Sequence, residues 1–331
     1  MIKYHSMATT LTLTDLYGDI TPHLEEVRAT VRKQWIDAFQ LVYGPTATPP
    51  RMGGKMMRPA LCFLSAGACG ETDLERFVPM AAGMELLHLA ALAHDDVVDS
   101  ANLRRGETSL NRLWDNHTAV LGGDYLVAKA LSILTVYDSC PVISSALESI
   151  HQMAEGELTF FGRSKENLGE EDCIMLSEKK TASLFAVSCC TPALLVDEKY
   201  RQPLFDFGMG MGTAFQLIDD LIDLEQDEDT LGKPSCGDIV EGKMTLPMIY
   251  MLEEMDAENQ NRFKYLMSRE ISETDKTWVR EQLMSTGAHK RVVDLCQKYV
   301  SEGQAAVQQL PESAYRDNMC HIADFVLIRD H

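Results

Sequence analysis

The chain contains no uninterrupted apolar run of the roughly 18–20 residues that a membrane-spanning helix needs. Its first residues lack the charged and then apolar pattern of a secretory signal peptide. Basic residues are also scarce, because 30 Lys and Arg against 50 Asp and Glu give a net charge of −20. So acidic a composition argues against broad nucleic-acid binding, which needs a basic face, and disfavours docking on anionic lipid through electrostatics alone. We therefore expect a cytoplasmic protein without integral membrane association or nucleic-acid partners.

Cysteine pairs of the CxxC type are absent too, although the chain has nine cysteines. Most of them lie in apolar segments, which favours reduced thiols packed as small core residues. The chain also lacks strand-like alternation, internal repeats, low-complexity linkers and an evident Ser-His-Asp or Cys-His nucleophile. We therefore expect one domain over residues 1–331, with residues 1–12 as a flexible tail and Met7 as an alternative start.

The hydrophobic residues that are present, 45% of the chain, recur with the period of helices. The pattern predicts helices over 13–42, 56–69, 73 to the aspartates at 95–99, 118–138, 142–161, 170–195 and 201–226. Pro192 predicts a kink inside the sixth of these helices. A loop is predicted over 227–243, followed by shorter amphipathic helices. A chain of 331 residues can bury a substantial core, so the fold class we predict is an all-α, single-domain helical bundle.

Two segments, HDDVVD and IDDLID, place aspartates with one DDxxD spacing at the ends of apolar helices. These aspartates are Asp95, Asp96, Asp99, Asp219, Asp220 and Asp223. Aspartate is a poor helix former, like charges one turn apart repel, and buried carboxylates need compensation. Oxygen-only clusters suit Mg²⁺, which is usually shared with phosphate oxygens. The clusters predict a phosphate or diphosphate bridged by metal to two facing helices, with solvated helix ends as the alternative. His94 is interpreted as orienting or structural.

Basic residues stand beside these clusters, against the acidic trend of the chain. They are Lys55, Arg58, Arg104, Arg105, Lys179, Lys180, Lys233 and Lys243. Lys55 and Arg58 lie at a predicted helix N-terminus, which is a natural anion site. Each alone could be a solvated surface charge. Together they indicate two bound polyanions rather than one.

Six motifs occur in order between Gly53 and Pro247: GGKxxRP, ExxHxxxxxHDDxxD followed by RRG, GDYL, KTAxLF, FQxxDDxxD, and GKPxxxDxxxxKxTLP. In this combination the chain resembles the trans-isoprenyl diphosphate synthases of the polyprenyl synthetase family. The resemblance implies a bundle of the isoprenoid synthase type around a central apolar cavity. It also implies a homodimeric prenyltransferase that uses Mg²⁺, about three ions per active site, to join an allylic diphosphate to isopentenyl diphosphate.

The same resemblance assigns roles to matching residues. The six aspartates would hold Mg²⁺ against the allylic diphosphate. The residues expected at that diphosphate are Arg104, Lys180, Thr181, Gln216 and Lys233, with Lys243 close by. Those expected at the diphosphate of isopentenyl diphosphate are Lys55, Arg58, His88 and Arg105. Thr159 and Phe160 depart from the family near a position where Gln is often found, which we expect to affect the cavity rather than the chemistry.

The length of the product is expected to depend on the helix that precedes Asp95. Ala90 and Ala91 are small, whereas family members that make short products often have a bulky aromatic residue there. Met84, eleven residues before Asp95, would lie about 16 Å deeper at 1.5 Å per residue, and Met84 and Leu87 are candidate floor residues. We predict a medium- or long-chain product from a farnesyl or geranylgeranyl primer, with geranylgeranyl diphosphate synthase as the alternative.

Three other interpretations are compatible with parts of the pattern. A terpene cyclase would use aspartate-rich motifs and Mg²⁺ but would not need a second diphosphate site. A catalytically silent regulatory subunit would bind an active relative, although both acidic clusters are intact. A purely structural helical protein is the most remote.

The predicted chemistry has three steps. The allylic C–O bond ionises, favoured by electrostatic stabilisation of the leaving diphosphate, the double bond of isopentenyl diphosphate attacks the carbocation, and a proton is lost.

Overall fold

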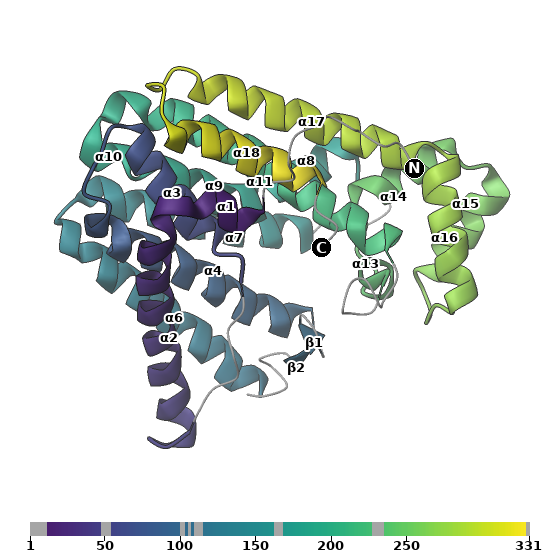
Figure 1. Ribbon diagram of the computed structural model, residues 1–331. Helices are drawn as coiled ribbons and strands as arrows, with labels where there is room; N and C mark the ends of the chain where they lie inside the picture. Colours follow the sequence, from purple (N-terminus) through teal and green to yellow (C-terminus); the bar gives the residue numbers. More distant parts are fainter. Residues whose placement is uncertain are drawn as a thin grey trace.

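The computed structural model describes residues 12–47, 54–99, 103–104, 107–108, 115–161, 168–226 and 235–328. Nearly all of these residues lie in helices or the turns between them (Figure 1). The one sheet among them is the antiparallel pair of β1 (Leu103–Arg104) and β2 (Glu107–Thr108). The prediction of an all-α fold is therefore confirmed. The proposed tail falls on residues outside this description, apart from Thr12.

The N-terminal third supplies α1 (Leu13–Tyr17), α2 (Thr21–Tyr43), α3 (Met57–Ala68) and α4 (Val78–Val98). Thr12 caps α1 through a reciprocal pair of bonds with Asp15, so its side chain is part of an ordered helix start. The helix predicted over 13–42 is broken by a short 3-10 turn before α2, and it ends at Gly44, whose φ is 91°. Helix α3 is buried along almost its whole length, which makes it a central core element.

The middle of the chain supplies α6 (Asn116–Leu134), α7 (Cys140–Phe161), α8 (Glu170–Ser177), α9 (Ser183–Cys190), α10 (Ala193–Val196) and α11 (Arg201–Glu225). The helix predicted over 170–195 differs in two ways. A π-helical turn, Glu178–Ala182, lies between α8 and α9. At Thr191 and Pro192 the helix gives way to a turn before α10, because proline has no N–H to continue the ladder. The expected kink is thus a break.

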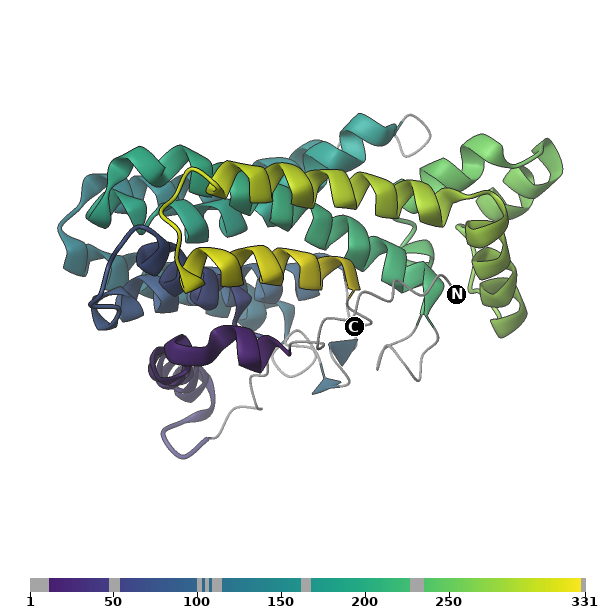
Figure 2. The ribbon, with the colours of Figure 1, turned by 45° about the horizontal axis from the view of Figure 1, so that its top comes forward.

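The C-terminal part supplies α13 (Gly237–Val240), α14 (Leu246–Glu254), α15 (Ala257–Leu266), α16 (Glu273–Ser285), α17 (Ala288–Val307) and α18 (Ala314–Ile328). The loop predicted over 227–243 therefore contains a short helix, α13, which is a correction. Helices α17 and α18 lie along the bundle, and α15 and α16 project from its end (Figures 1 and 2).

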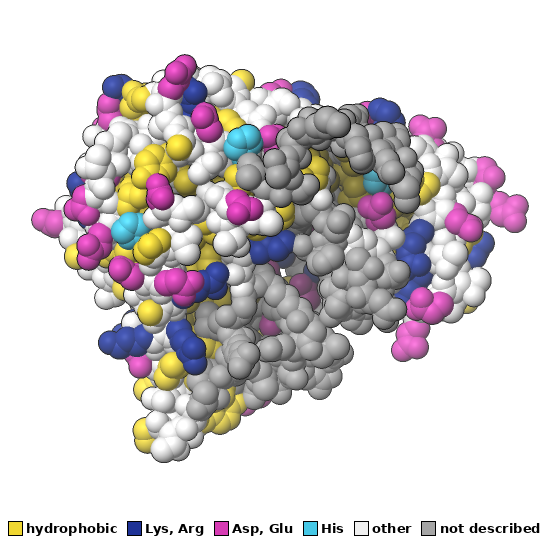
Figure 3. All heavy atoms as spheres, in the orientation of Figure 1, with side chains coloured by type: hydrophobic (Ala, Val, Ile, Leu, Met, Phe, Trp, Pro, Cys, Tyr) yellow, Lys and Arg dark blue, Asp and Glu magenta, His cyan; other side chains and the backbone are white. Residues whose placement is uncertain are grey.

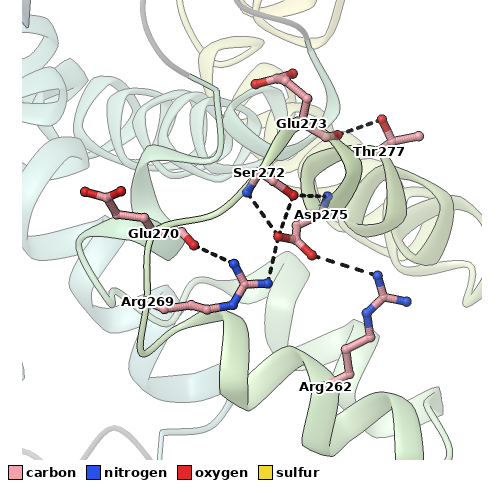
Figure 4. A network of polar contacts seen from close by, with 7 residues as sticks. All are labelled: Arg262, Arg269, Glu270, Ser272, Glu273, Asp275 and Thr277. Atoms are coloured by element: carbon pink, nitrogen blue, oxygen red, sulfur yellow. Dashed lines mark hydrogen bonds and ion pairs between the residues drawn. The ribbon is translucent and has the colours of Figure 1, made fainter.

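A polar network fixes the corner between the projecting helices α15 and α16 (Figure 4). The carboxylate of Asp275 accepts the backbone N–H of Ser272 at 3.0 Å and a guanidinium N–H of Arg269 at 2.8 Å. Arg262 lies 3.9 Å from the other oxygen. The bonds from Ser272 and the Arg269 charge lower the pKa of Asp275 to about 2. This carboxylate is a helix cap, so we assign it to structure rather than function.

Helix α11 is central, because it packs along both α9 and α17. Two of its glycines make the contact with the α9 side possible. A Cβ on Gly208 would lie 2.4 Å from the Cα of Ala186, and one on Gly212 would lie 2.6 Å from the Cα of Ala182. No side chain fits at such distances, so Gly208 sets how closely α11 approaches α9, and Gly212 sets how closely it approaches the π-helical turn. That approach positions the second aspartate cluster.

Two helical segments, Glu75–Val98 and Asn116–Tyr137, are long and apolar enough to cross a membrane by length and composition alone. Core helices pass the same test, so the property is weak evidence for a span. The apolar window of the first segment is 61% buried within the chain, and that of the second only 33%. The second segment, which contains α6, therefore leaves apolar surface that its own chain does not cover.

All nine cysteines are free, and seven of them are buried. The exceptions are Cys140, which is exposed, and Cys320, which is partly buried. This agrees with the expectation of small core thiols without disulfides. Burial raises the pKa of the Cys190 thiol to about 11, so this thiol stays protonated near neutral pH.

Candidate functional site

The first aspartate cluster ends α4. Asp95 and Asp99 lie one turn apart and are partly exposed, with side chains 24% and 18% accessible, whereas Asp96 is fully buried. Asp99 caps the helix, and its N–H donates to the carbonyl of Asp95 at 2.8 Å. The predicted shared face of the first and last aspartates is therefore present. Asp96 points into the protein instead.

The second cluster lies near the end of α11. Asp219 and Asp220 are partly buried, and Asp223 is buried. Asp220 accepts a hydrogen bond from the side-chain amide of Gln216 at 2.8 Å, and Gln216 in turn accepts the hydroxyl of Thr181 at 2.7 Å. Thr181, Gln216 and Asp220, which the sequence placed at one diphosphate, are thus connected in one chain of hydrogen bonds.

The electrostatics of this cluster favour a cation. Burial and the nearby charge of Asp223 raise the pKa of Asp220 to about 6, although the Gln216 bond and the ammonium groups of Lys180 and Lys243 act in the opposite direction. A cation bound beside Asp220 would stabilise the ionised form of this carboxylate, which burial and the charge of Asp223 destabilise.

Lys180 and Lys243 bring the first cluster into the same site. Lys180 lies in the π-helical turn, and its Nζ is 3.5 Å from an oxygen of Asp95. Lys243 follows α13, and its Nζ is 2.8 Å from Asp99 and 2.9 Å from Glu241. Burial lowers the pKa of each lysine, but the carboxylates raise it by more, so both are cations. In Figure 3 acidic and basic side chains are visible around a central hollow of this face.

The residues assigned to the second diphosphate are only partly described. Lys55 is exposed, with its ammonium 5.7 Å from the ring centre of Phe325, and Arg58 lies over the ring of Phe185 at 4.2 Å. Between them Met56 adopts a left-handed conformation, with φ of 54°, immediately before α3. Both basic residues therefore flank a helix N-terminus, as the sequence predicted.

Four further residues complete this comparison. His88 is partly buried on α4, two turns before Asp95 and on the same helix face. Arg105 and Lys233 lie outside the described residues, and of Arg104 only the backbone, in β1, is described. Their assignments stay predictions.

The predicted chain-length residues lie along α4. Met84, Leu87 and Ala90 are buried, and Ala91 is partly buried. Two hollows of about 170 and 200 Å³ occur elsewhere, beside Tyr315 and beside Tyr299, and neither is bordered by the four cavity residues. The role of Met84, Leu87, Ala90 and Ala91 in setting the product length stays a prediction.

His94 points away from the aspartates, as a structural residue would. Its Nε2 lies 3.2 Å from the carbonyl oxygen of Val120 and 3.4 Å from the carboxylate of Asp124, both on α6. A Cβ on Gly123 would lie only 2.2 Å from that nitrogen. The glycine and aspartate of the GDYL motif therefore dock α6 against α4.

Sequence reasoning missed the carboxylates on the far side of the two lysines. Glu241 pairs with Lys243, and Glu157 on α7 pairs with Lys180. For Glu157 the only signal was the segment EGE at 155–157, which is opposite in charge to the two lysines of the EKK segment at 178–180. Nothing in their spacing showed that they would meet.

The donor set fits a hard divalent cation that is shared with a ligand. Among the residues that the structure describes, no three Asp, Glu, His or Cys side chains are grouped so that they could hold a metal by themselves. Asp95 and Asp99 nevertheless each face an ammonium group, so cationic charge already occupies the positions beside them. Mg²⁺ keeps several waters and takes phosphate oxygens, which suits two incomplete carboxylate sets.

Comparison with known proteins identifies the family. The polyprenyl synthetase family matches residues 40–283. The chain belongs to the polyprenyl synthetase family. It is 38% identical over 283 residues to the all-trans-nonaprenyl-diphosphate synthase (geranyl-diphosphate specific) of Rhodobacter capsulatus, covering 84% of this chain and 86% of the relative. It is 31% identical to the octaprenyl diphosphate synthase of Escherichia coli, covering 97% of each chain.

The fold of this polyprenyl synthetase also matches a solved structure. The polyprenyl synthase of Caulobacter crescentus, complexed with calcium and isoprenyl diphosphate, superposes with a TM-score of 0.87 at 28% identity, covering 98% of this chain and 100% of that chain. The predictions of family, of an all-α isoprenoid synthase fold and of a prenyltransferase are therefore confirmed.

Proposed function

We propose that this protein joins an allylic diphosphate to isopentenyl diphosphate repeatedly and releases a trans-polyprenyl diphosphate of medium or long chain. The observation that carries the proposal is the pairing of Lys180 with Asp95 and of Lys243 with Asp99. Both ammonium groups also act on Asp220 of the second cluster, so basic groups and two carboxylate clusters share one site. A diphosphate bound there would have cations on several sides.

The reaction follows from that arrangement. The allylic C–O bond breaks, and its electron pair leaves with the diphosphate, whose growing charge Lys180 and Lys243 stabilise. The double bond of isopentenyl diphosphate attacks the carbocation, and loss of a proton forms the new double bond. The released diphosphate is a suitable proton acceptor. Thr181 and Gln216 orient Asp220, and the apolar helices around the site exclude water.

The six aspartates would hold Mg²⁺, about three ions, and the bound metal would supply positive charge that favours departure of the diphosphate. Asp95, Asp99, Asp219 and Asp220 have accessible side chains and are the direct ligands in this proposal. Asp96 and Asp223, the other two of the six predicted aspartates, are buried behind these four side chains. Arg104 and Lys233 remain assigned to the allylic diphosphate. Lys55, Arg58, His88 and Arg105 remain assigned to isopentenyl diphosphate.

A medium or long product is supported by the small residues Ala90 and Ala91. The names of the nonaprenyl and octaprenyl relatives point the same way. Farnesyl or geranylgeranyl diphosphate is the primer we expect, although the Rhodobacter relative is named for geranyl diphosphate. A geranylgeranyl diphosphate synthase is the alternative. A cytoplasmic location, predicted from composition, is part of the same proposal.

A homodimer is also part of this proposal. Helix α6 exposes Val120 and Leu121, and only 33% of its apolar window is buried by its own chain. A second copy of the chain would cover that surface and remove it from water.

The decisive experiment incubates the purified chain with Mg²⁺, labelled isopentenyl diphosphate and, in separate reactions, geranyl, farnesyl or geranylgeranyl diphosphate. The dephosphorylated products are then resolved by length. We expect a ladder that ends at one long prenol and disappears with EDTA. Product formed without isopentenyl diphosphate would indicate a cyclase. No product from any primer would indicate a silent subunit that needs an active partner.

A further inference from the structure

Two ion pairs join helix α7 to the π-helical turn. Lys179 Nζ lies 2.7 Å from Glu155, and Lys180 forms an ion pair with Glu157. Gly156 stands between the two glutamates, and a Cβ there would lie 2.9 Å from the Cβ of Lys179. The absence of a side chain at Gly156 therefore lets α7 come close enough for both glutamates to reach their lysines.

The two ion pairs differ in one respect. In the described part of the chain, Lys179 forms its ion pair with Glu155, whereas Lys180 is shared between Glu157 and Asp95. The Lys180 ammonium is 3.5 Å from Asp95, and its side chain is only 25% accessible. Lys180 therefore connects a proposed metal ligand to a carboxylate outside both aspartate clusters.

Binding of a divalent cation at Asp95 changes this arrangement. An ammonium and a divalent cation compete for the same carboxylate oxygens, and they repel each other at short distance. Lys180 must give up Asp95 when the cation binds. A partly buried ammonium that loses its counter-charge is costly, unless a second carboxylate keeps it paired.

We propose that Glu157 is a positioning residue that holds the Lys180 ammonium away from Asp95 when a divalent cation binds, and so presents it to the diphosphate. This inference rests on the proposed roles of Asp95 and Lys180. Glu157 touches neither the reacting carbons nor the metal in this scheme. It acts through Lys180 by lowering the lysine's competition for Asp95.

The test compares Glu157→Gln with Glu155→Gln, which removes the same charge from the same helix two residues away. Two quantities are measured across a Mg²⁺ titration: the elongation rate, and the rise in melting temperature caused by inorganic diphosphate. For E157Q we expect the half-saturating Mg²⁺ concentration to rise about fivefold in both assays, because Lys180 then competes fully for Asp95. Excess Mg²⁺ should restore most of the rate. E155Q should stay within about twofold of the wild type.

A double variant separates this role from a general packing role. In a Lys180→Met background the competitor is gone, so adding E157Q should no longer shift the Mg²⁺ requirement of diphosphate-induced stabilisation. The proposal is overturned if E157Q matches E155Q, or if its defect persists at saturating Mg²⁺. Asp95→Asn tests the underlying site. If D95N binds diphosphate with unchanged Mg²⁺ dependence, the assignment of the metal site fails; if D95N loses that dependence while E157Q is normal, only the role of Glu157 fails.

Discussion

The carboxylate of Asp223 accepts the backbone N–H of Asp238 at 3.1 Å, and its carbonyl accepts the N–H of Cys236 at 2.8 Å. The side chain is only 4% accessible. Asp223 therefore ties the end of α11 to the segment that leads to Lys243. Although its spacing repeats that of Asp99, its contacts in the structure are those of a residue that positions the chain around the site.

Replacing Asp223 by Asn should separate these two roles. Asparagine keeps an oxygen that can accept the Asp238 N–H, so D223N should need about the same Mg²⁺ concentration as the wild type, within about threefold. Asp223→Ala leaves that N–H without its acceptor and should lower the free energy of unfolding by about 1–3 kcal/mol. Activity against Mg²⁺ concentration and urea unfolding measure the two effects.

Asp219→Asn is the matched comparison, because its side chain is more accessible and lies one helical turn away. We expect D219N to raise the Mg²⁺ requirement about tenfold or more. An equally large increase in D223N would mean that Asp223 binds the metal directly.

The raised pKa of Asp220 predicts a pH dependence with a defined sign. Its pKa is about 6 in the folded protein, against 3.8 for an ordinary aspartate. The metal-free fold therefore gains stability as pH falls from about 6 towards 4, because the folded state takes up the proton first. Divalent cations need the ionised form, so their binding should weaken over the same range.

Calorimetric titration with Mg²⁺ and inorganic diphosphate at pH 7.5 and 5.5 measures this effect. The wild type should bind more weakly at the lower pH, and Asp220→Asn should show a smaller change between the two values, because it cannot take up that proton. Equal pH dependence in both proteins would show that other groups control the binding.

The grouping of site residues was predictable from sequence only where a motif repeats. The paired DDxxD spacing identified both clusters, because residues four apart share a helix face. The burial of Asp96 and Asp223 was not predictable, since it depends on which neighbours cover each helix. Glu157 was also missed, because its contact with Lys180 joins two helical segments that α8 separates in the sequence.

At the scale of elements, helix ends were the more predictable part. The helix predicted to end at residue 42 ends at Tyr43, before Gly44, and Pro192, where a kink was predicted, breaks its helix for a local reason. The π-helical turn was not, because one such turn is too short to give the apolar pattern a period of its own. That turn is nevertheless what carries Lys180 to the site, so local periodicity alone could not place this lysine.

Side chains along helix α4 should determine the chain length of the product. Ala91 and Met84 are separated by two turns, about 10 Å of helix, and lie on the Asp95 face. Ala91→Phe should fill the space near the aspartates and shorten the longest product, whereas Met84→Ala should deepen the pocket and lengthen it. Product ladders from one primer measure both effects.

Ser65→Ala provides a control for these variants, because Ser65 is a buried residue on α3 and outside the predicted cavity set. Its product length should be unchanged. If A91F and M84A shift the product in the same direction, or not at all, α4 does not line the growing chain.

At the scale of the whole molecule, a large net negative charge is combined with an exposed apolar surface on α6. The chain carries a net charge of −20, which opposes nonspecific association. Helix α6 still exposes apolar side chains, with Leu121 54% accessible. Such a surface on an otherwise highly charged molecule favours one specific contact, and a two-fold pairing of two copies would bury the same face on each.

Leu121→Glu tests that contact, because a charge on each copy would meet at or near the two-fold axis and oppose association. Met284→Glu on α16 is the control: Met284 is similarly exposed, at 58%, but belongs to the projecting helices at the other end of the molecule (Figure 1). Sedimentation velocity at micromolar concentration should show a dimer for the wild type and M284E, and a largely monomeric L121E. A monomeric wild type, or equal dissociation in both variants, would exclude α6 as the dimer surface. If L121E is monomeric and also loses elongation while M284E does not, pairing through α6 also supports the proposed active site, to which the neighbouring helix α4 contributes the first aspartate cluster.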